Sequence, residues 1–253
     1  MKRKILIIFG VILLVAGFVI GGIGLRNHLA EKNAGEIYED LKVQMDIEPI
    51  INLPMVETER IENPIDFESL TAEYPDIYAW IRIPGTRVDY PIVQREGDNG
   101  YYLNHTIDGK KRTEGSIYTE DYNSKDFADP VTIIYGHNMR NGSMFKTLHK
   151  YKDKQFLLDN SEIFIYQKDR VLKYKIFAAY VSDNKHLLFK YDFEDENIFE
   201  NYLNNVLTKR DMSSNINTNV DVTASDKIIT LCTCNNNDAQ RYLVQAVLLS
   251  IQE

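Results

Sequence analysis

Hydrophobic positions recur with a period of two, three or four residues along most of the chain, but the first segment is continuously apolar. The run from Ile5 to Leu25 spans 21 residues and contains no charged or strongly polar side chain. A helix of that length covers about 30 Å, which is roughly the hydrocarbon core of a bilayer. Lys2, Arg3 and Lys4 precede the run, and positive charge tends to remain on the cytoplasmic side. The pattern predicts a single-pass membrane anchor with its N-terminus in the cytoplasm and the rest of the chain outside.

A cleaved signal peptide is the alternative interpretation of this segment. The apolar run is longer than the core of a usual signal peptide, and no A-x-A-like cleavage site follows it. A retained anchor is therefore favoured.

Helical spacing of apolar residues appears in three later segments. Residues 34–45 place apolar side chains four positions apart, and Asp66 is suited to cap a short helix over residues 67–74. The apolar stripe of residues 195–209 predicts one long amphipathic helix. Residues 46–65 contain three prolines and are predicted to form an extended connection.

Most of the remaining chain has the composition and short period of β-strands. Predicted strands cover residues 80–83, 88–93, 115–118, 131–135, 162–167, 172–181, 228–234 and 241–251, with a short helix over 144–150. Strands do not alternate with helices, which argues against a parallel doubly wound sheet. Many short strands at roughly even spacing favour a closed or nearly closed barrel, so the predicted fold is mainly β with peripheral helices.

Three regions follow from this pattern. Residues 1–28 form a cytoplasmic tip and transmembrane anchor, residues 29–65 form a helical and extended linker, and residues 66–253 form one domain. No internal repeat and no low-complexity segment interrupts that domain.

Charge and composition exclude several classes of protein. The chain of 253 residues has a net charge of −8, and the part after residue 28 has 25 basic and 37 acidic residues. Because phosphate recognition needs a basic surface, this balance argues against a nucleic-acid partner. Two cysteines are too few for a disulfide framework or a four-thiolate zinc site. No metal and no cofactor is predicted.

Both cysteines lie on the predicted strand 228–234. Cys232 and Cys234 are two residues apart, so their side chains share one face of the strand. Polar loop sequence begins after Cys234, which places this thiol at a strand end, where catalytic groups are common. Outside the cell, a thiol without a distant partner is more often reactive than structural. The alternative is a small buried core residue, which is the usual environment of a free cysteine.

A cysteine nucleophile needs a base or a nearby cation. Among the five histidines, His137 follows directly on the strand 131–135, with Gly136 supplying a tight turn, so it is the favoured partner. Arg241 begins the strand after the Cys234 loop, and its guanidinium can donate hydrogen bonds to a developing oxyanion. A structural histidine and a solvated surface arginine are the alternatives.

These motifs resemble those of the class B sortases. Residues 230–234, Thr-Leu-Cys-Thr-Cys, match the TLxTC signature of sortases, and an arginine lies on the following strand. Residues 135–139, Tyr-Gly-His-Asn-Met, look like the sortase histidine segment. Further similarity to class B is carried by residues 80–86, 89–94, 101–105, 115–118 and the helix 195–209. The resemblance covers about residues 66–253 and implies an eight-stranded β-barrel.

The resemblance also implies a reaction, that of a cysteine transpeptidase. Cys234 would attack the threonine carbonyl of a C-terminal sorting signal of the Asn-Pro-x-Thr type and form a thioacyl enzyme. His137 would act as acid and base, and Arg241 would steady the oxyanion or the bound peptide. Cys232 and Asn104 are expected to contact the substrate, although several relatives have a serine in place of Cys232. The position of Asn236 carries an acid in some relatives.

The implied partners are surface proteins that bear the sorting signal, a peptidoglycan precursor or cell-wall amine, and the membrane. A pilin-polymerising sortase would instead use a lysine of another pilin as the amine. A secreted thiol protease would hydrolyse the same kind of peptide with water. A wall-binding protein without catalytic activity is the third alternative.

Overall fold

The computed structural model describes residues 2–47, 61–235, 237 and 239–253, apart from the side chains of residues 2–15. Its strands are β1 Ile77–Arg82, β2 Asp89–Val93, β3 Ile117–Tyr118, β4 Val131–Tyr135, β5 Glu162–Tyr166, β6 Val171–Asp183, β7 Asn215–Ile216, β8 Ile228–Cys234 and β9 Gln240–Gln252. The α-helices are α1 Lys2–Lys32, α2 Glu36–Gln44, α3 Phe67–Glu73, α4 Lys154–Asp159, α5 Leu187–Lys190 and α6 Glu196–Leu207. Two 3₁₀ helices are η1 Tyr101–Leu103 and η2 Phe145–Lys152.

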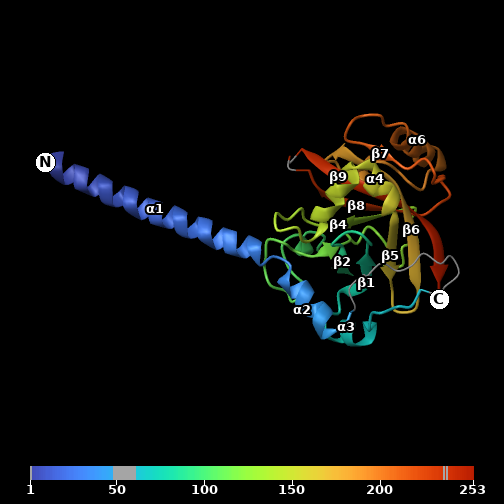
Figure 1. The fold of residues 1–253 in the computed structure, drawn as a ribbon, viewed down its shortest axis with the longest axis horizontal. Helices are drawn as coiled ribbons and strands as arrows, with labels where there is room; N and C mark the ends of the chain where they lie inside the picture. The colour runs from blue at the N-terminus through green and yellow to red at the C-terminus, as the bar shows by residue number, and fades with distance from the viewer. Residues whose placement is uncertain (1, 48–60, 236, 238) are drawn as a thin grey trace.

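Eight of these strands form a closed β-barrel, which confirms the predicted fold class (Figure 1). The order around the barrel is β5-β1-β2-β3-β4-β8-β9-β6, and antiparallel pairing between β5 and β6 closes the ring. The short β7 pairs with β6 outside this ring. A closed ring leaves no long unpaired strand edge, so nearly all strand backbone groups find partners within the barrel.

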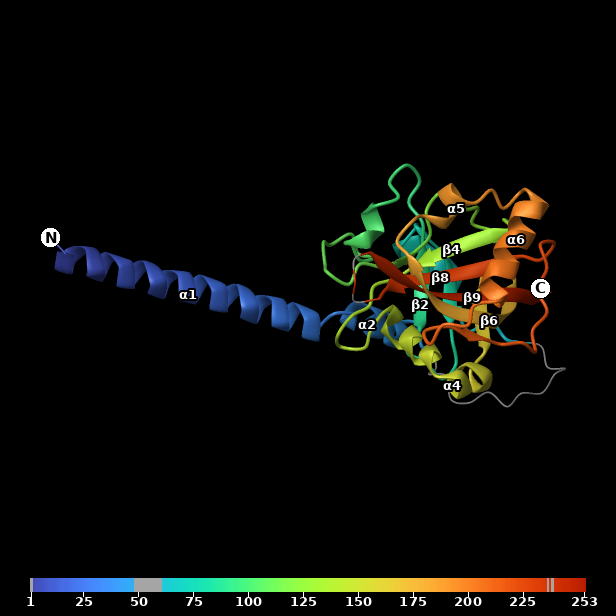
Figure 2. The same ribbon diagram turned by 90° about the horizontal axis from the view of Figure 1, so that it is seen from above.

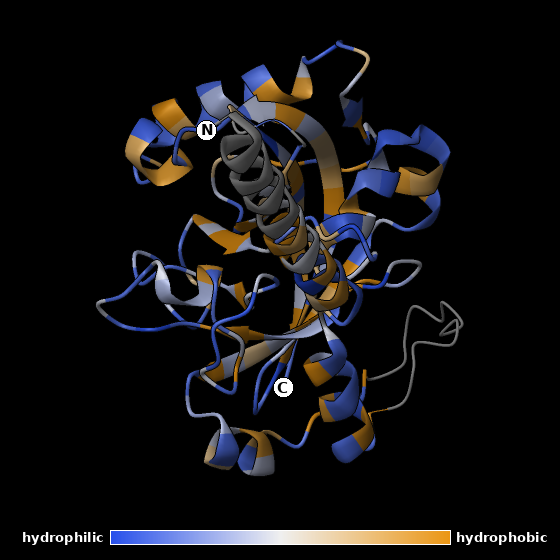
Figure 3. Ribbon diagram, turned by 90° about the vertical axis from the view of Figure 1, so that its left-hand side faces the viewer, coloured by the Kyte–Doolittle hydropathy of each residue, from blue (hydrophilic) through white to orange (hydrophobic). Residues whose placement is uncertain are grey.

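Two sets of buried side chains pack on the two faces of the barrel wall. Successive side chains of β8 point to opposite faces of the wall. Ile229 and Leu231 belong to the larger cluster, and Ile228 and Cys232 belong to the smaller one. The smaller cluster also includes the apolar face of α6, which lies against the barrel in Figure 2. In Figure 3 the apolar colouring concentrates on the strands, whereas the loops are mostly polar.

The N-terminal helices differ in their packing. Helix α2 packs on the barrel through Tyr38, whose hydroxyl hydrogen-bonds with the Gly115 carbonyl at 2.6 Å and with Ser116 Oγ at 2.9 Å. Helix α1 extends away from the barrel (Figure 1), and its apolar side chains Phe18 and Ile20 are exposed. Helix α2 is therefore part of the folded domain, while the exposed apolar side chains of α1 have no apolar partner in the described chain.

Among the described residues, no helix is both long and apolar enough to cross a membrane. The predicted span Ile5–Leu25 lies partly outside this described part, because the side chains of residues 5–15 are not described. Residues 48–60 of the predicted linker and Asn236 also lie outside it.

The predicted elements match the structure closely where the pattern is strong. The hairpin of β1 and β2 is antiparallel, and Asp66 caps α3 by accepting from the backbone N–H groups of Glu68 and Ser69. The short helix predicted over residues 144–150 is present as the 3₁₀ helix η2. The short elements η1, α4, α5 and β7 do not follow from the sequence pattern, because their apolar positions are too few to establish a period.

Candidate active site

Cys234 is the last residue of β8 and lies at one rim of the barrel. The six preceding residues of the strand are buried, whereas Cys234 is exposed and its thiol is free. The strand pairs in parallel with β4 on one side and antiparallel with β9 on the other. Ladders on both sides fix the backbone, so the exposed thiol sits on a rigid support.

Cys232, two residues earlier, has a different environment. Its side chain is buried in the smaller cluster, and only 8% of the residue is exposed. Burial raises the pKa of this thiol to about 12, and the nearby Arg241 charge offsets only part of that effect. Cys232 is therefore protonated at neutral pH, which disfavours it as a nucleophile relative to Cys234.

His137 lies beside the end of β8 because of the strand register. Tyr135 is opposite Cys232 in the parallel pair of β4 and β8, and the Gly136 N–H continues the ladder to the Cys232 carbonyl at 3.2 Å. His137 therefore lies at the level of Cys234, two residues beyond the last registered pair. Its Nε2 is 2.6 Å from the carbonyl oxygen of Leu103, and since a carbonyl only accepts, Nε2–H donates. Nδ1 is the nitrogen left to exchange a proton.

Arg241 lies on the other side of Cys234. The two residues are directly opposite each other in the antiparallel pair of β8 and β9. The guanidinium donates to the Gln240 carbonyl at 2.9 Å, and it lines a cavity of about 140 Å³ together with Cys232. A guanidinium group thus borders a cavity next to the exposed thiol.

Two side chains that sequence reasoning did not assign hold the backbone of Cys234. Its carbonyl accepts from Asn138 Nδ2 at 3.0 Å and from His149 Nε2 at 3.1 Å. Burial and the neighbouring Lys152 lower the pKa of His149, so this ring is neutral at ordinary pH and donates from Nε2. Asn138 directly follows His137 in the sequence, and this neighbourhood could have indicated that it lies at the site. His149 lies on η2, and only tertiary packing brings it to Cys234, so the sequence did not indicate it.

Asn104 lies next to Leu103, the residue that holds the His137 ring in place. It follows Leu103, whose carbonyl holds His137, and its side chain is exposed. Its backbone carbonyl accepts from the Arg112 N–H at 2.9 Å, which fixes the turn. The residue is accessible beside the site, and contact with a substrate stays a prediction.

The 140 Å³ cavity has a polar wall that the sequence did not reveal. His186 Nε2 lies 2.5 Å from Glu120 Oε2, and both residues line the cavity with Tyr135 and Leu187. This pair ties the segment after β6 to the end of β3. It therefore keeps the loop that precedes α5 against the barrel, beside Cys232.

The barrel thus brings a thiol, an imidazole and a guanidinium to the ends of three neighbouring strands. This set can perform nucleophilic attack, proton transfer and oxyanion stabilisation. The model of the sortase domain family matches residues 81–249. Sortase B of Listeria monocytogenes is 37% identical over 179 residues, which are 69% of this chain and 70% of that protein. The chain belongs to the sortase family, class B.

Solved structures of class B sortases are similar over most of this sortase. The Staphylococcus aureus sortase B–substrate complex has a TM-score of 0.70 and 28% identity, covering 88% of this chain and 99% of that one. A sortase B complexed with triglycine also has a TM-score of 0.70 and 28% identity, covering 87% and 98%. The resemblance predicted from the motifs is confirmed. Sortases are cell-surface transpeptidases, and this enzyme shares that activity.

Proposed function

We propose that this sortase cleaves an Asn-Pro-x-Thr type sorting signal after its threonine and transfers the acyl part to an amine of peptidoglycan or its precursor. Cys234, His137 and Arg241 are the catalytic residues of this proposal. One observation carries it: the three residues lie at the same ends of the neighbouring strands β4, β8 and β9, with Arg241 directly opposite Cys234.

The first half-reaction forms the thioacyl enzyme. The Cys234 thiol gives its proton to Nδ1 of His137, and Sγ forms a bond to the threonine carbonyl carbon. Arg241 donates hydrogen bonds to the oxyanion that develops. The C–N bond then breaks, and His137 returns the proton to the leaving amine. Neutral His149 and Asn138 hold the Cys234 carbonyl, which keeps the thiol aimed at the substrate.

The second half-reaction releases the product. An incoming amine attacks the thioester carbon and gives a proton to His137. The C–S bond breaks, Cys234 leaves as a thiolate, and His137 returns the proton to it. The relatives supply support for both partners, because one solved sortase B is a substrate complex and another is complexed with triglycine, a peptide with a free amine. The amine of the cell wall is the corresponding acceptor for this chain.

The substrate-binding surface is proposed to lie beside Arg241. Cys232 lines the 140 Å³ cavity, and its weak S–H donor faces the space where the residues before the threonine would lie. Asn104 is exposed next to Leu103, whose carbonyl holds His137. Together they would orient the signal so that its threonine carbonyl reaches Cys234.

The proposed location is the cell membrane, with the catalytic domain outside. In this proposal residues 1–28 are the cytoplasmic tip and anchor, residues 29–65 connect the anchor to the barrel and include the packed helix α2, and residues 66–253 are the catalytic domain. The support is the apolar run behind three basic residues and the exposure of Phe18 and Ile20 on α1. Large apolar side chains exposed along a helix need an apolar environment, and a bilayer supplies one.

The test is intact-mass spectrometry of residues 29–253 incubated with a sorting peptide of the Asn-Pro-x-Thr type. We expect a mass increase equal to the acyl part in the native sequence and in Cys232→Ser, and none in Cys234→Ala. Adding a short amino-terminal glycine peptide should remove the adduct and yield the transpeptidation product. An adduct that persists in Cys234→Ala and disappears in Cys232→Ser would reverse the assignment of the two thiols.

A further inference from the structure

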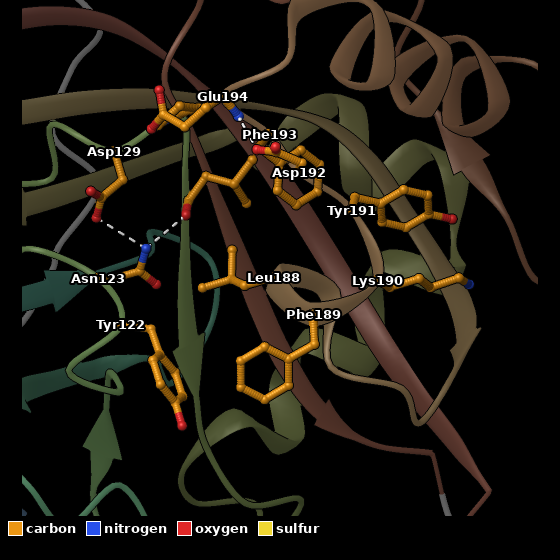
Figure 4. Close-up of a pocket in the computed structure, with 12 residues that line it drawn as sticks. Tyr122, Asn123, Asp129, Leu188, Phe189, Lys190, Tyr191, Asp192, Phe193 and Glu194 are labelled. Atoms are coloured by element: carbon orange, nitrogen blue, oxygen red, sulfur yellow. Dashed lines mark hydrogen bonds between the residues drawn. The ribbon is translucent and has the colours of Figure 1, made fainter.

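A second cavity lies on the outer face of β4, beside the proposed active site, and no step of the reaction above uses it (Figure 4). Its volume is about 450 Å³. We call it the β4 groove and define it by its apolar and its acidic lining. These residues are Tyr122, Leu188, Phe189, Asp129, Asp192 and Glu194.

The apolar end of the β4 groove is unusually open to solvent. Phe189 is 69% exposed and Tyr122 is 53% exposed, and their rings meet edge to face with centroids 5.1 Å apart. Leu188 lies above both rings in Figure 4. Exposed aromatic pairs of this kind are typical of surfaces that bind a partner, because aromatic side chains supply much contact area at low entropic cost.

The opposite end of the β4 groove is negatively charged. The carboxylates of Asp129, Asp192 and Glu194 gather there in Figure 4. Lys190 also lines the groove, but its ammonium is paired with Asp183 at 3.0 Å. Apolar contact at one end and acidic side chains at the other complement a chain segment that carries an apolar and a basic side chain.

The β4 groove continues the surface that holds the proposed site. Val131 lines the groove, whereas Ile133 and Tyr135 line the 140 Å³ cavity with Cys232 and Arg241. Alternate residues of a strand share one face, so both cavities lie along the same face of β4. The linings of the two cavities also touch, because the His186 ring of the smaller cavity stacks on Phe189 of the groove with centroids 4.2 Å apart.

Distance along β4 sets how much substrate would span the two cavities. His137, which is level with Cys234, is six positions from Val131, or about 20 Å at the rise of a strand. An extended peptide covers the same distance in about six residues. A signal whose threonine is at Cys234 would therefore place its four-residue motif along the smaller cavity, and the two or three residues before the motif would reach the groove.

We propose that the β4 groove is a specificity subsite for the substrate residues that immediately precede the sorting motif. An apolar side chain of that segment packs on Tyr122 and Phe189, and a basic side chain faces Asp192 and Glu194. This inference rests on the proposed function, since that function fixes the motif at Cys234. It adds a second region of recognition outside the motif.

The test compares three peptides with the same motif: a minimal peptide, one extended at its N-terminus by a segment containing leucine and lysine, and one extended there by glycine and serine. For the native enzyme we expect the leucine–lysine extension to raise kcat/KM roughly fivefold or more over the minimal peptide, through KM. The glycine–serine extension should give no gain. Added salt should reduce the gain, because the acidic contacts are exposed.

Two variants of the groove and two matched controls locate the effect. Phe189→Ala and the double variant Asp192→Asn/Glu194→Gln should remove most of the ratio of extended to minimal kcat/KM. Leu249→Ala, at a residue that is 51% exposed elsewhere, and Glu200→Gln on α6 should keep the ratio.

The two ways of failing are distinguishable. An enzyme that acylates the minimal peptide but gains nothing from the leucine–lysine extension contradicts the subsite alone. The same holds if an extension after the threonine, or a change of amine, proves sensitive to the groove variants. An enzyme that never acylates the minimal peptide contradicts the proposed function first, and the subsite with it.

Discussion

At the scale of single residues, two cysteines that the sequence places on the same face of a strand differ in how deeply they are buried in the barrel wall. Cys232 is buried and Cys234 is exposed, although only Thr233 stands between them. Burial raises the pKa of Cys232 to about 12, and only the thiolate form of a cysteine attacks an alkylating reagent readily. The thiolate form of Cys232 would appear only when the pH rises toward that value.

Alkylation should therefore label one cysteine of the folded enzyme. Iodoacetamide at about pH 8, near the pKa of an ordinary thiol, is expected to modify Cys234 and leave Cys232 intact, as measured by peptide mass spectrometry. In urea both should react. Equal labelling of the two thiols in the folded protein would contradict the burial of Cys232.

Arg241 provides a second prediction at this scale. Losing a charged donor to an oxyanion typically costs about 2.7–4 kcal/mol, or roughly a hundred- to a thousandfold in kcat. We expect Arg241→Ala to lose this much in steady-state transpeptidation. Arg241→Lys keeps the charge without the planar fork, so it should also be impaired. Native kinetics in Arg241→Ala would remove the residue from the mechanism.

At the scale of elements, the short turn after β4 determines where His137 lies. A Cβ on Gly136 would come within 2.5 Å of Ile117 Cδ1 and 2.7 Å of the Phe145 ring. Both neighbours are fully buried, so neither can move aside without disturbing the core.

Gly136→Ala should therefore destabilise the fold by about 1–3 kcal/mol and displace His137. Urea unfolding measures the first effect and the rate of thioacyl formation the second. Gly100→Ala is the control, because its Cβ would meet nothing closer than 3.9 Å. Equal behaviour of the two variants would show that the turn tolerates the methyl group.

The elements also show what the sequence could predict. Long strands such as β6 and β9, and the amphipathic α6, carry a clear period, and the positions of His137, Cys234 and Arg241 at strand ends followed from that period. The parallel pairing of β4 with β8 did not, because register between distant strands depends on the closed barrel. Contacts that rest on this pairing were therefore missed, as the hydrogen bond from Asn138 to the Cys234 carbonyl shows.

At the scale of the whole molecule, the N-terminal segment is tied to the barrel that it precedes. Tyr38 and Leu41 of α2 are buried, and Tyr38 is bonded to the segment before β3. Ala34 and Ile47 belong to the same cluster as the barrel interior. The segment that the sequence predicts as a linker is thus partly a packed element of the fold.

Removing α2 should weaken the fold. Burial of a large apolar side chain contributes about 1.5–3 kcal/mol, so a chain that begins at residue 66 should lose at least about 3 kcal/mol of unfolding free energy. Urea unfolding of this chain is compared with one that begins at residue 33, which keeps α2. Coincident unfolding curves would mean that α2 adds nothing to the stability of the domain.

The central claim is that acyl transfer passes through Cys234 to an amine. The most direct measurement traps the acyl enzyme from a sorting peptide at low pH, digests it, and locates the added mass by tandem mass spectrometry. The account predicts that the acyl group is on Cys234, and that a peptide amine releases it much faster than water does. An acyl group on Cys232 or on no cysteine, or release by water alone, would contradict it.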